Sequence, residues 1–128
     1  MENPAIFDDH KKEIAIAEAL YFGFGCVWCP TLDDFVYFGK LGFRHLIRKG
    51  RKFRTRNEQC RRLALLPYTP IILKDKSAIL DADNRYTEKI KYWTLKAPYK
   101  KDDITVVVMQ IKQGKKYFVS IYAKSKNP

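Results

Sequence analysis

The clearest pattern of hydrophobic and polar positions lies in the last third of the chain. Residues 89–96, 104–112 and 115–124 are rich in β-branched and aromatic side chains, which favour strands. Gln113 and Gly114 provide a tight connection between the second and third segments, and short connections of this kind join antiparallel strands. The pattern therefore predicts an antiparallel meander.

Side chains alternate between the two faces of a strand, so the third segment can be divided into faces. The face expected to meet the core holds Tyr117, Val119, Ile121 and Ala123. The opposite face, which mixes aromatic, hydroxyl and cationic groups, holds Phe118, Ser120, Tyr122 and Lys124.

The first half of the chain predicts helices separated by short irregular segments. Residues 9–21 contain no Gly or Pro, which predicts a helix capped by Asp8 or Asp9 and ended by Gly23 and Gly25. Residues 43–49 predict a second, short helix, because Phe43, Leu46 and Ile47 recur at helical spacing; Gly50 would end it. A third helix is expected over residues 58–66 with Asn57 as its cap.

The segments between these helices are expected to be loops or short strands. Residues 34–38 are a strand candidate, and residues 71–73 begin a further short element after a turn bracketed by Pro67 and Pro70. The loops and turns are expected at residues 22–32, 39–42, 51–56 and 75–86. The fold class is thus α+β, with N-terminal helices packed on a small antiparallel β-sheet to which residues 34–38 add a strand.

Length and composition predict one domain spanning residues 1–128. The chain has 128 residues, of which 46% are hydrophobic and 14% aromatic, enough to form a core. Charge divides the domain unevenly. Residues 1–33 form an acidic helical part, whereas residues 34–128 carry the basic and strand-forming segments.

Positive charge is concentrated in residues 40–62, KLGFRHLIRKGRKFRTRNEQCRR. This segment holds ten Lys and Arg against one Glu, which gives it +9 of the chain's formal net charge of +11. A field of this strength attracts polyanions, and Arg and Lys pair well with phosphate. The nucleic-acid contacts expected from this segment are Arg44, Arg48, Lys49, Arg51, Lys52 and Arg56.

His45 lies inside the basic segment. Histidine can give or take a proton near neutral pH, and metal-free cleavage of RNA requires proton transfer next to bound phosphate. Two interpretations follow: a ribonuclease that uses His45, or a non-catalytic basic RNA- or DNA-binding protein with an incidental histidine. The basic segment by itself favours the second.

The three cysteines carry a weaker signal. An odd number argues against a disulfide framework, and Cys26-Val-Trp-Cys29 has the CxxC spacing of a zinc knuckle or a redox pair. The soft ligands that could complete a zinc site are Cys60, His45 and His10. Because a single CxxC without a second such motif is weak, ordinary reduced cysteines are expected, with no metal and no cofactor.

No apolar run approaches the roughly 20 residues that a membrane span needs. The N-terminus also lacks a basic start followed by an apolar stretch, which is the pattern of a secretory signal. These features predict a cytoplasmic protein that does not bind membranes.

Three stretches of the chain resemble a known ribonuclease family. They are GFRHLIRKGRKFR (42–54), RRLALLP (61–67) and TVVVMQIKQGKKYFVSIY (105–122). In this order they are similar to the phage-associated branch of the barnase–EndoU–colicin–RelE ribonuclease fold. The resemblance implies a small, metal-independent and often toxic ribonuclease, whose nuclease core is residues 34–128.

The resemblance also implies roles for individual residues. The family's helix histidine falls on His45, the hydroxyl of its last strand on Ser120, and a basic residue near the start of its sheet on Lys96 or Lys91. It places phosphate contacts on Arg51, Arg54 and Arg62. The CxxC motif departs from the family pattern, and no Glu stands where some members have a carboxylate base; Glu58 is expected to be an ordinary helix N-terminal charge.

The chemistry expected of these residues is attack of the RNA 2′-OH on the adjacent phosphate. His45 would transfer the proton, and Arg54 or Arg62 would hold the phosphate oxygens. Ser120 and Tyr122 would donate hydrogen bonds to the phosphate. Exposed bases would stack on Tyr92, Trp93, Tyr117 or Phe118. The expected partner is RNA or another nucleic acid, and an acidic antitoxin or immunity protein is a further candidate.

Overall fold

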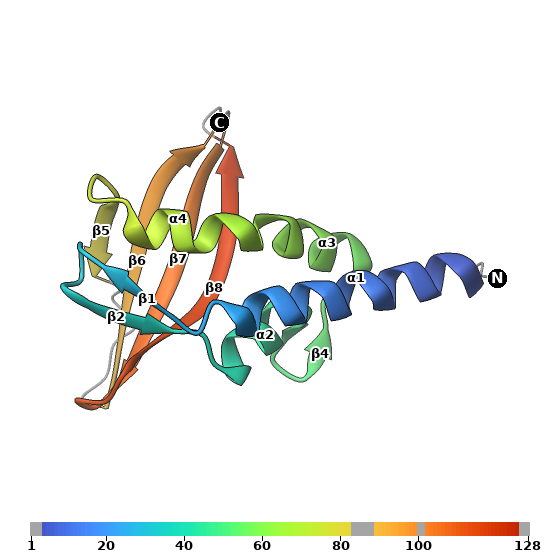
Figure 1. The fold of residues 1–128 in the computed structure, drawn as a ribbon, viewed down its shortest axis with the longest axis horizontal. Coiled ribbons are helices and arrows are strands. Elements are labelled where there is room, and N and C mark those ends of the chain that lie inside the picture. The colour runs from blue at the N-terminus through green and yellow to red at the C-terminus, as the bar shows by residue number, and fades with distance from the viewer. Residues whose placement is uncertain (1–3, 83–88, 100–101, 126–128) are drawn as a thin grey trace.

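The protein, seen in a computed structural model, has a mixed α+β fold in which helices pack on one side of a curled sheet (Figure 1). The structure describes residues 4–82, 89–99 and 102–125. The helical elements are α1 (Pro4–Gly23), α2 (Lys40–Ile47), α3 (Arg56–Leu65), the 3-10 turn η1 (Leu66–Tyr68) and α4 (Thr69–Lys74). The strands are β1 (Cys26–Cys29), β2 (Asp34–Tyr37), β3 (Arg48–Lys49), β4 (Lys52–Phe53), β5 (Ile79–Ala82), β6 (Ile90–Tyr99), β7 (Asp102–Ile111) and β8 (Lys116–Ser125).

The six strands of the main sheet follow the order β1-β2-β8-β7-β6-β5, and β3 and β4 form a separate hairpin. The meander of β6, β7 and β8 is antiparallel with sequential connections, as the sequence predicts. The sheet is not purely antiparallel, however, because β2 pairs with β8 in parallel. Parallel neighbours need a long crossover, and here the chain between β2 and β8 contains α2, α3 and α4 as well as the sheet strands β5, β6 and β7.

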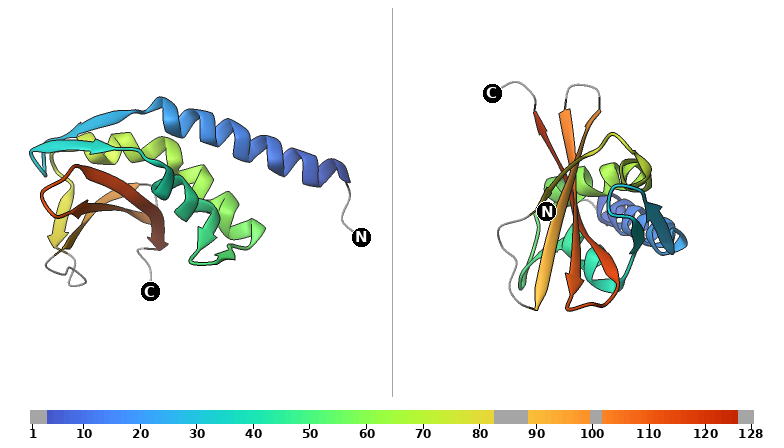
Figure 2. Two further views of the ribbon diagram at one scale, coloured as in Figure 1. Left: turned by 90° about the horizontal axis from the view of Figure 1, so that it is seen from below. Right: turned by 90° about the vertical axis from the view of Figure 1, so that its left-hand side faces the viewer.

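The core lies between the sheet and the helices. Leu95, Val106 and Ile121 from the sheet are fully buried, as are Leu46 of α2 and Leu73 of α4. Figure 2 shows the helices gathered on one side of β6–β8, with α1 outermost and its N-terminal end extending past the sheet. No helix within the described residues combines the length and apolar character that crossing a membrane requires.

Strand β8 departs from the expected alternation because it contains a bulge. Val107 pairs with Ser120 but Val108 pairs with Phe118, which leaves Val119 as an extra residue in β8. Phe118 and Ile121 therefore both face the core, at 1% and 0% exposure. The predicted grouping of Phe118 with Ser120 on one outward face is wrong, since an inserted residue reverses the face of every residue beyond it.

Several element boundaries also differ from expectation. The first helix begins at Pro4, so Asp8 and Asp9 lie inside it and do not cap it. The cap of α3 is Thr55, whose hydroxyl accepts a hydrogen bond from the Glu58 N–H at 3.2 Å, and not Asn57. Thr55 and Glu58 have the spacing of a capping box, which outweighs the preference of Asn for the cap.

Four segments expected to be irregular contain ordered elements, and one of them, residues 51–56, holds β4 and the first residue of α3. Residues 26–29 form β1, because pairing with β2 buries Val27 and Cys29. The expected turn at residues 39–42 contains the start of α2. The expected loop at 75–86 contains β5, which pairs with β6, while residues 83–86 of that loop lie outside the described residues. For β1 and β5, pairing with the neighbouring strand supplies the stabilisation that local composition does not indicate.

Candidate nucleic-acid site

The basic segment folds into α2, the β3–β4 hairpin and α3, which bring its charges around the end of α2. Gly50, at a φ of 64°, turns the hairpin. Beyond β4, the Arg54 N–H donates to the Ile47 carbonyl at 2.8 Å. The Arg54 Nε also donates to the His45 carbonyl at 2.8 Å. Because a cation next to helix C-terminal carbonyls is favourable, Arg54 closes the end of α2 and lies against the backbone of His45.

Arg62 links α3 to the bulged part of β8. Its Nη1 donates to the Ser120 Oγ at 2.7 Å and to the Ile121 carbonyl at 3.3 Å. Its Nε donates to the Glu58 Oε1 at 3.0 Å, one helical turn earlier. The Arg62 side chain is only 14% exposed. These contacts fix the guanidinium at the junction of α3 and β8.

His45 is surrounded by positive charge. Burial lowers the pKa of the His45 imidazole below its usual value, and the neighbouring cations Arg54, Arg62 and Arg44 lower it further. Burial and Arg62 likewise lower the pKa of Arg54, against the opposite effect of Glu58. The pKa of Glu58 is lowered, chiefly by its hydrogen bond with Arg62. At neutral pH the site therefore combines a neutral imidazole, ionised arginines and one carboxylate.

Two hollows open at this site. The first, of about 180 Å³, is lined by Leu41, Arg44, His45, Arg48 and Gly50. The second, of about 400 Å³, lies between α3 and the ends of β7 and β8, where Arg62 and Glu58 face Tyr122. Of the predicted residues, His45 lines the first hollow, and Arg62 and Tyr122 line the second. Arg62 also contacts Ser120, and the charges of Arg54 and Arg62 both act on the His45 imidazole. The other nucleic-acid contacts expected from the segment, Lys49, Arg51, Lys52 and Arg56, are exposed.

Lys96 does not join this group. It lies on β6, where its Nζ is 3.7 Å from the Asp81 Oδ2. Lys96 pairs with Thr105 of β7, and Thr105 pairs with Tyr122 of β8. Lys96 therefore shares a sheet face with Tyr122, but the two residues are separated by two strand spacings, roughly 10 Å. Lys91, the alternative, is an exposed residue near the other end of β6.

An exposed aromatic surface, of which only Tyr117 was expected from the sequence, extends along β1, β2 and the start of β8. Trp28 and Phe35 are 44% and 43% exposed, with ring centroids 5.0 Å apart. Tyr37 and Tyr117 follow at 6.0 Å, and the Lys115 Nζ lies 4.6 Å above the Tyr37 ring. Cross-strand partners share a face, so this surface is on the same sheet face as Ser120.

The aromatic residues that were expected to stack bases divide into two groups. Tyr117 belongs to the exposed surface at 38% exposure. Phe118 is buried, so its expected role is wrong, and Trp93 packs partly buried against the core.

Two further polar residues of the site were missed from the sequence, and only the first of them carried a signal. Glu58 and Arg62 stand four residues apart, the spacing at which opposite charges meet on a helix, yet Glu58 was expected only to favour the start of the helix. Gln59 is 7% exposed, and its Nε2 donates to the Arg54 carbonyl at 2.9 Å. Nothing in the local sequence indicates that this amide is buried.

The CxxC motif does not present its thiols as a pair. Residues three apart in a strand point to opposite faces, and Cys26 is exposed whereas Cys29 is fully buried. Burial raises the pKa of the Cys29 thiol above its usual value. This geometry is that of separate cysteines.

Comparison with known proteins leaves the site to be interpreted from its own geometry. No protein-family model matches the chain, and no curated protein or solved structure matches it significantly.

Proposed function

We propose that the protein is a metal-independent endoribonuclease that cleaves single-stranded RNA by attack of a 2′-OH on the adjacent phosphate. The observation that carries the proposal is the junction where Arg62 contacts Ser120 and Glu58 beside a neutral, half-buried His45. A base with a lowered pKa next to fixed cations is the combination that this reaction requires. The family resemblance of the three sequence stretches points in the same direction.

In the proposed reaction His45 acts as the base. The imidazole accepts the proton of the 2′-OH, the 2′-oxygen forms a bond to phosphorus, and the bond from phosphorus to the 5′-oxygen breaks. The leaving 5′-oxygen takes a proton from water, and the imidazolium returns its proton to solvent. The products are a 2′,3′-cyclic phosphate and a 5′-hydroxyl.

The arginines would stabilise the charge that develops on the phosphate. Nε and Nη1 of Arg62 make its contacts within the protein, and a guanidinium carries two more N–H donors on Nη2. Arg54, held against the end of α2, would supply a second cation. Preorganised donors of this kind typically contribute about 10²–10³-fold to a rate.

The exposed aromatic surface supports single-stranded RNA as the substrate. Bases of a single strand can stack on aromatic rings, whereas paired bases are covered by their neighbours. Trp28, Phe35 and Tyr117 lie on the same sheet face as Ser120, and the exposed cations of residues 40–62 would hold the backbone.

Analysis of the cleavage products tests this proposal. A single-stranded RNA should yield 2′,3′-cyclic phosphate ends, and the same oligonucleotide made entirely of 2′-deoxynucleotides should be bound but not cut. Binding of both should weaken steeply with salt, because several Lys and Arg displace condensed counterions. Binding without any cleavage of the RNA would favour the alternative, a non-catalytic basic protein; cleavage of the deoxy strand would contradict 2′-OH attack.

A further inference from the structure

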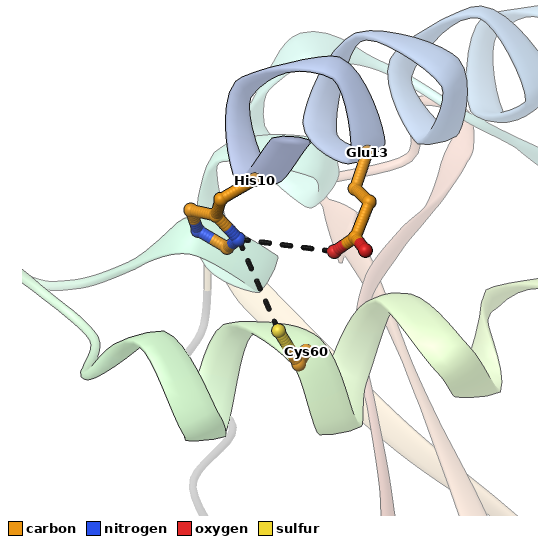
Figure 3. Close-up of side chains that lie close together, drawn as sticks. All are labelled: His10, Glu13 and Cys60. Atoms are coloured by element: carbon orange, nitrogen blue, oxygen red, sulfur yellow. Dashed lines mark hydrogen bonds and ion pairs between the residues drawn. The ribbon is translucent and has the colours of Figure 1, made fainter. Parts of the chain in front are cut away.

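Three side chains of types that bind transition metals meet where α1 packs on α3, apart from the site described above (Figure 3). His10 and Glu13 lie one turn apart on α1, and Cys60 faces them from α3. The His10 Nδ1 is 3.9 Å from the Cys60 Sγ and 3.9 Å from the Glu13 Oε2. All three ligand atoms lie within 4.8 Å of one another.

These separations are close to those of a zinc site. Zinc binds sulfur at about 2.3 Å and imidazole nitrogen at about 2.0 Å, and tetrahedral geometry then places the two ligands about 3.5 Å apart. Movement of each side chain by a fraction of an ångström would bring the three ligand atoms to the spacing of a zinc site. His10 and Cys60 are half-buried, and Glu13 is exposed, so the group has both a sheltered side and access to solvent.

A buried neighbour orients His10 for metal binding. The Gln59 Nε2 donates to the Arg54 carbonyl, which leaves the Gln59 Oε1 facing the His10 Nε2 at 3.0 Å. The opposite amide orientation would set two carbonyl oxygens against each other. The His10 Nε2 therefore donates to Gln59, and in the neutral imidazole the lone pair lies on Nδ1, the atom that faces Cys60 and Glu13. Metal-binding histidines commonly donate their other N–H to such a fixed oxygen.

We propose that His10, Glu13 and Cys60 bind one Zn²⁺ ion, with water as the fourth ligand. A thiolate, an imidazole and a carboxylate suit zinc, whereas Ca²⁺ and Mg²⁺ prefer oxygen ligands throughout. A groove of about 390 Å³ between α1 and α3, which Glu13 and Cys60 help to line, gives the ion a path from solvent.

The ion would fasten α1 to α3. The contact between α1 and α3 is also linked to His45. Gln59, which contacts His10, donates to the Arg54 carbonyl, and the Arg54 Nε donates to the His45 carbonyl. This inference does not depend on the proposed nuclease activity, because the three ligands and the groove include none of the residues assigned to RNA cleavage.

Cobalt(II) provides a direct test, because it adopts zinc geometry and is coloured. Titration of the metal-free, reduced protein with Co²⁺ should give one equivalent of binding, a thiolate-to-cobalt charge-transfer band and the visible bands of a four-coordinate ion. Zn²⁺ should then bleach these bands. Zn²⁺ should also raise Tm by at least about 4 °C at a hundredfold excess over its dissociation constant.

Variants locate the ion. Cys60→Ser should abolish the charge-transfer band, and Glu13→Gln, at an exposed position that does not threaten folding, should weaken Zn²⁺ binding at least tenfold. Cys26→Ser is the matched control, because Cys26 is an exposed thiol on β1, and should leave the spectrum unchanged. The proposal is overturned if the parental protein shows no thiolate band with Co²⁺. It is also overturned if Cys26→Ser removes the band while Cys60→Ser keeps it, or if Glu13→Gln binds Zn²⁺ as the parental protein does.

Discussion

Replacing Arg62 by alanine should destabilise the protein far more than replacing its neighbour Arg61. Arg62 is 14% exposed and joins α3 to β8 through Ser120 and the Ile121 carbonyl, while Arg61 is 77% exposed. The two arginines are adjacent in one helix and share Glu58 as an ionic partner, at 3.0 Å from Arg62 and 3.8 Å from Arg61. Arg61→Ala is therefore a matched control for the loss of charge and helix propensity.

The magnitude follows from these contacts. Hydrogen bonds from a charged donor contribute about 1.5–3 kcal/mol to stability, and the partly exposed pair with Glu58 adds about 0.2–1 kcal/mol. Water can enter from the hollow beside Tyr122 and solvate Ser120 after truncation, which reduces the loss. The expected cost of Arg62→Ala is about 2–4 kcal/mol, against less than about 0.5 kcal/mol for Arg61→Ala.

Urea unfolding followed by circular dichroism measures this difference. With a slope of about 1–3 kcal/mol per molar urea for a chain of this size, the midpoint of Arg62→Ala should fall by about 1–2 M relative to Arg61→Ala. Equal midpoints for the two variants would refute the inference that Arg62 holds α3 to β8. In RNA assays at conditions where it is folded, Arg62→Ala should lose both affinity and cleavage rate, because a phosphate clamp acts in the ground state and the transition state.

Three further predictions concern pH, RNA binding and packing. The pKa of His45 is lowered in the folded protein, so the acidic limb of kcat/KM should lie below about pH 6.5, the pKa of an unperturbed histidine. A limb above that pH would contradict a lowered pKa. Trp28→Ala should weaken binding of a single-stranded oligonucleotide by about 1–3 kcal/mol in a titration, and unchanged affinity would exclude stacking there. Gly42→Ala should cost about 1–3 kcal/mol in urea unfolding, because its Cβ would lie 2.5 Å from the Phe118 carbonyl oxygen. Gly23→Ala, with open space around it, should not destabilise, and equal costs would contradict this packing.

The elements that the sequence predicts well are those with a strong local pattern. The strands β6, β7 and β8 and the central part of α1 follow from composition and periodicity. Strand β1 could not be recognised from CVWC, because its stability comes from pairing with β2. The bulge at Val119 was also beyond prediction, since it depends on how β8 pairs with β7 rather than on its own residues.

The candidate site, too, is only partly predictable from the sequence. The concentration of cations around His45 is visible in the sequence, and the structure adds which of them approach the imidazole. His10, by contrast, was named from the sequence only as a soft ligand that could complete a zinc site with Cys26 and Cys29. The structure places it against Gln59 and Cys60 of α3, a contact across 49 residues that no local pattern encodes.

Cleavage by the His45→Ala variant tests the central proposal most directly. Single-turnover rates on a labelled single-stranded RNA should be measured at saturating protein, with affinity measured separately on the uncleavable deoxy strand. The account predicts a rate at least about 100-fold below the parental rate, and an affinity within about twofold of the parental value, since a neutral imidazole adds no charge to the ten cations of residues 40–62. Cleavage by His45→Ala at the parental rate would contradict the assignment of His45 as the base.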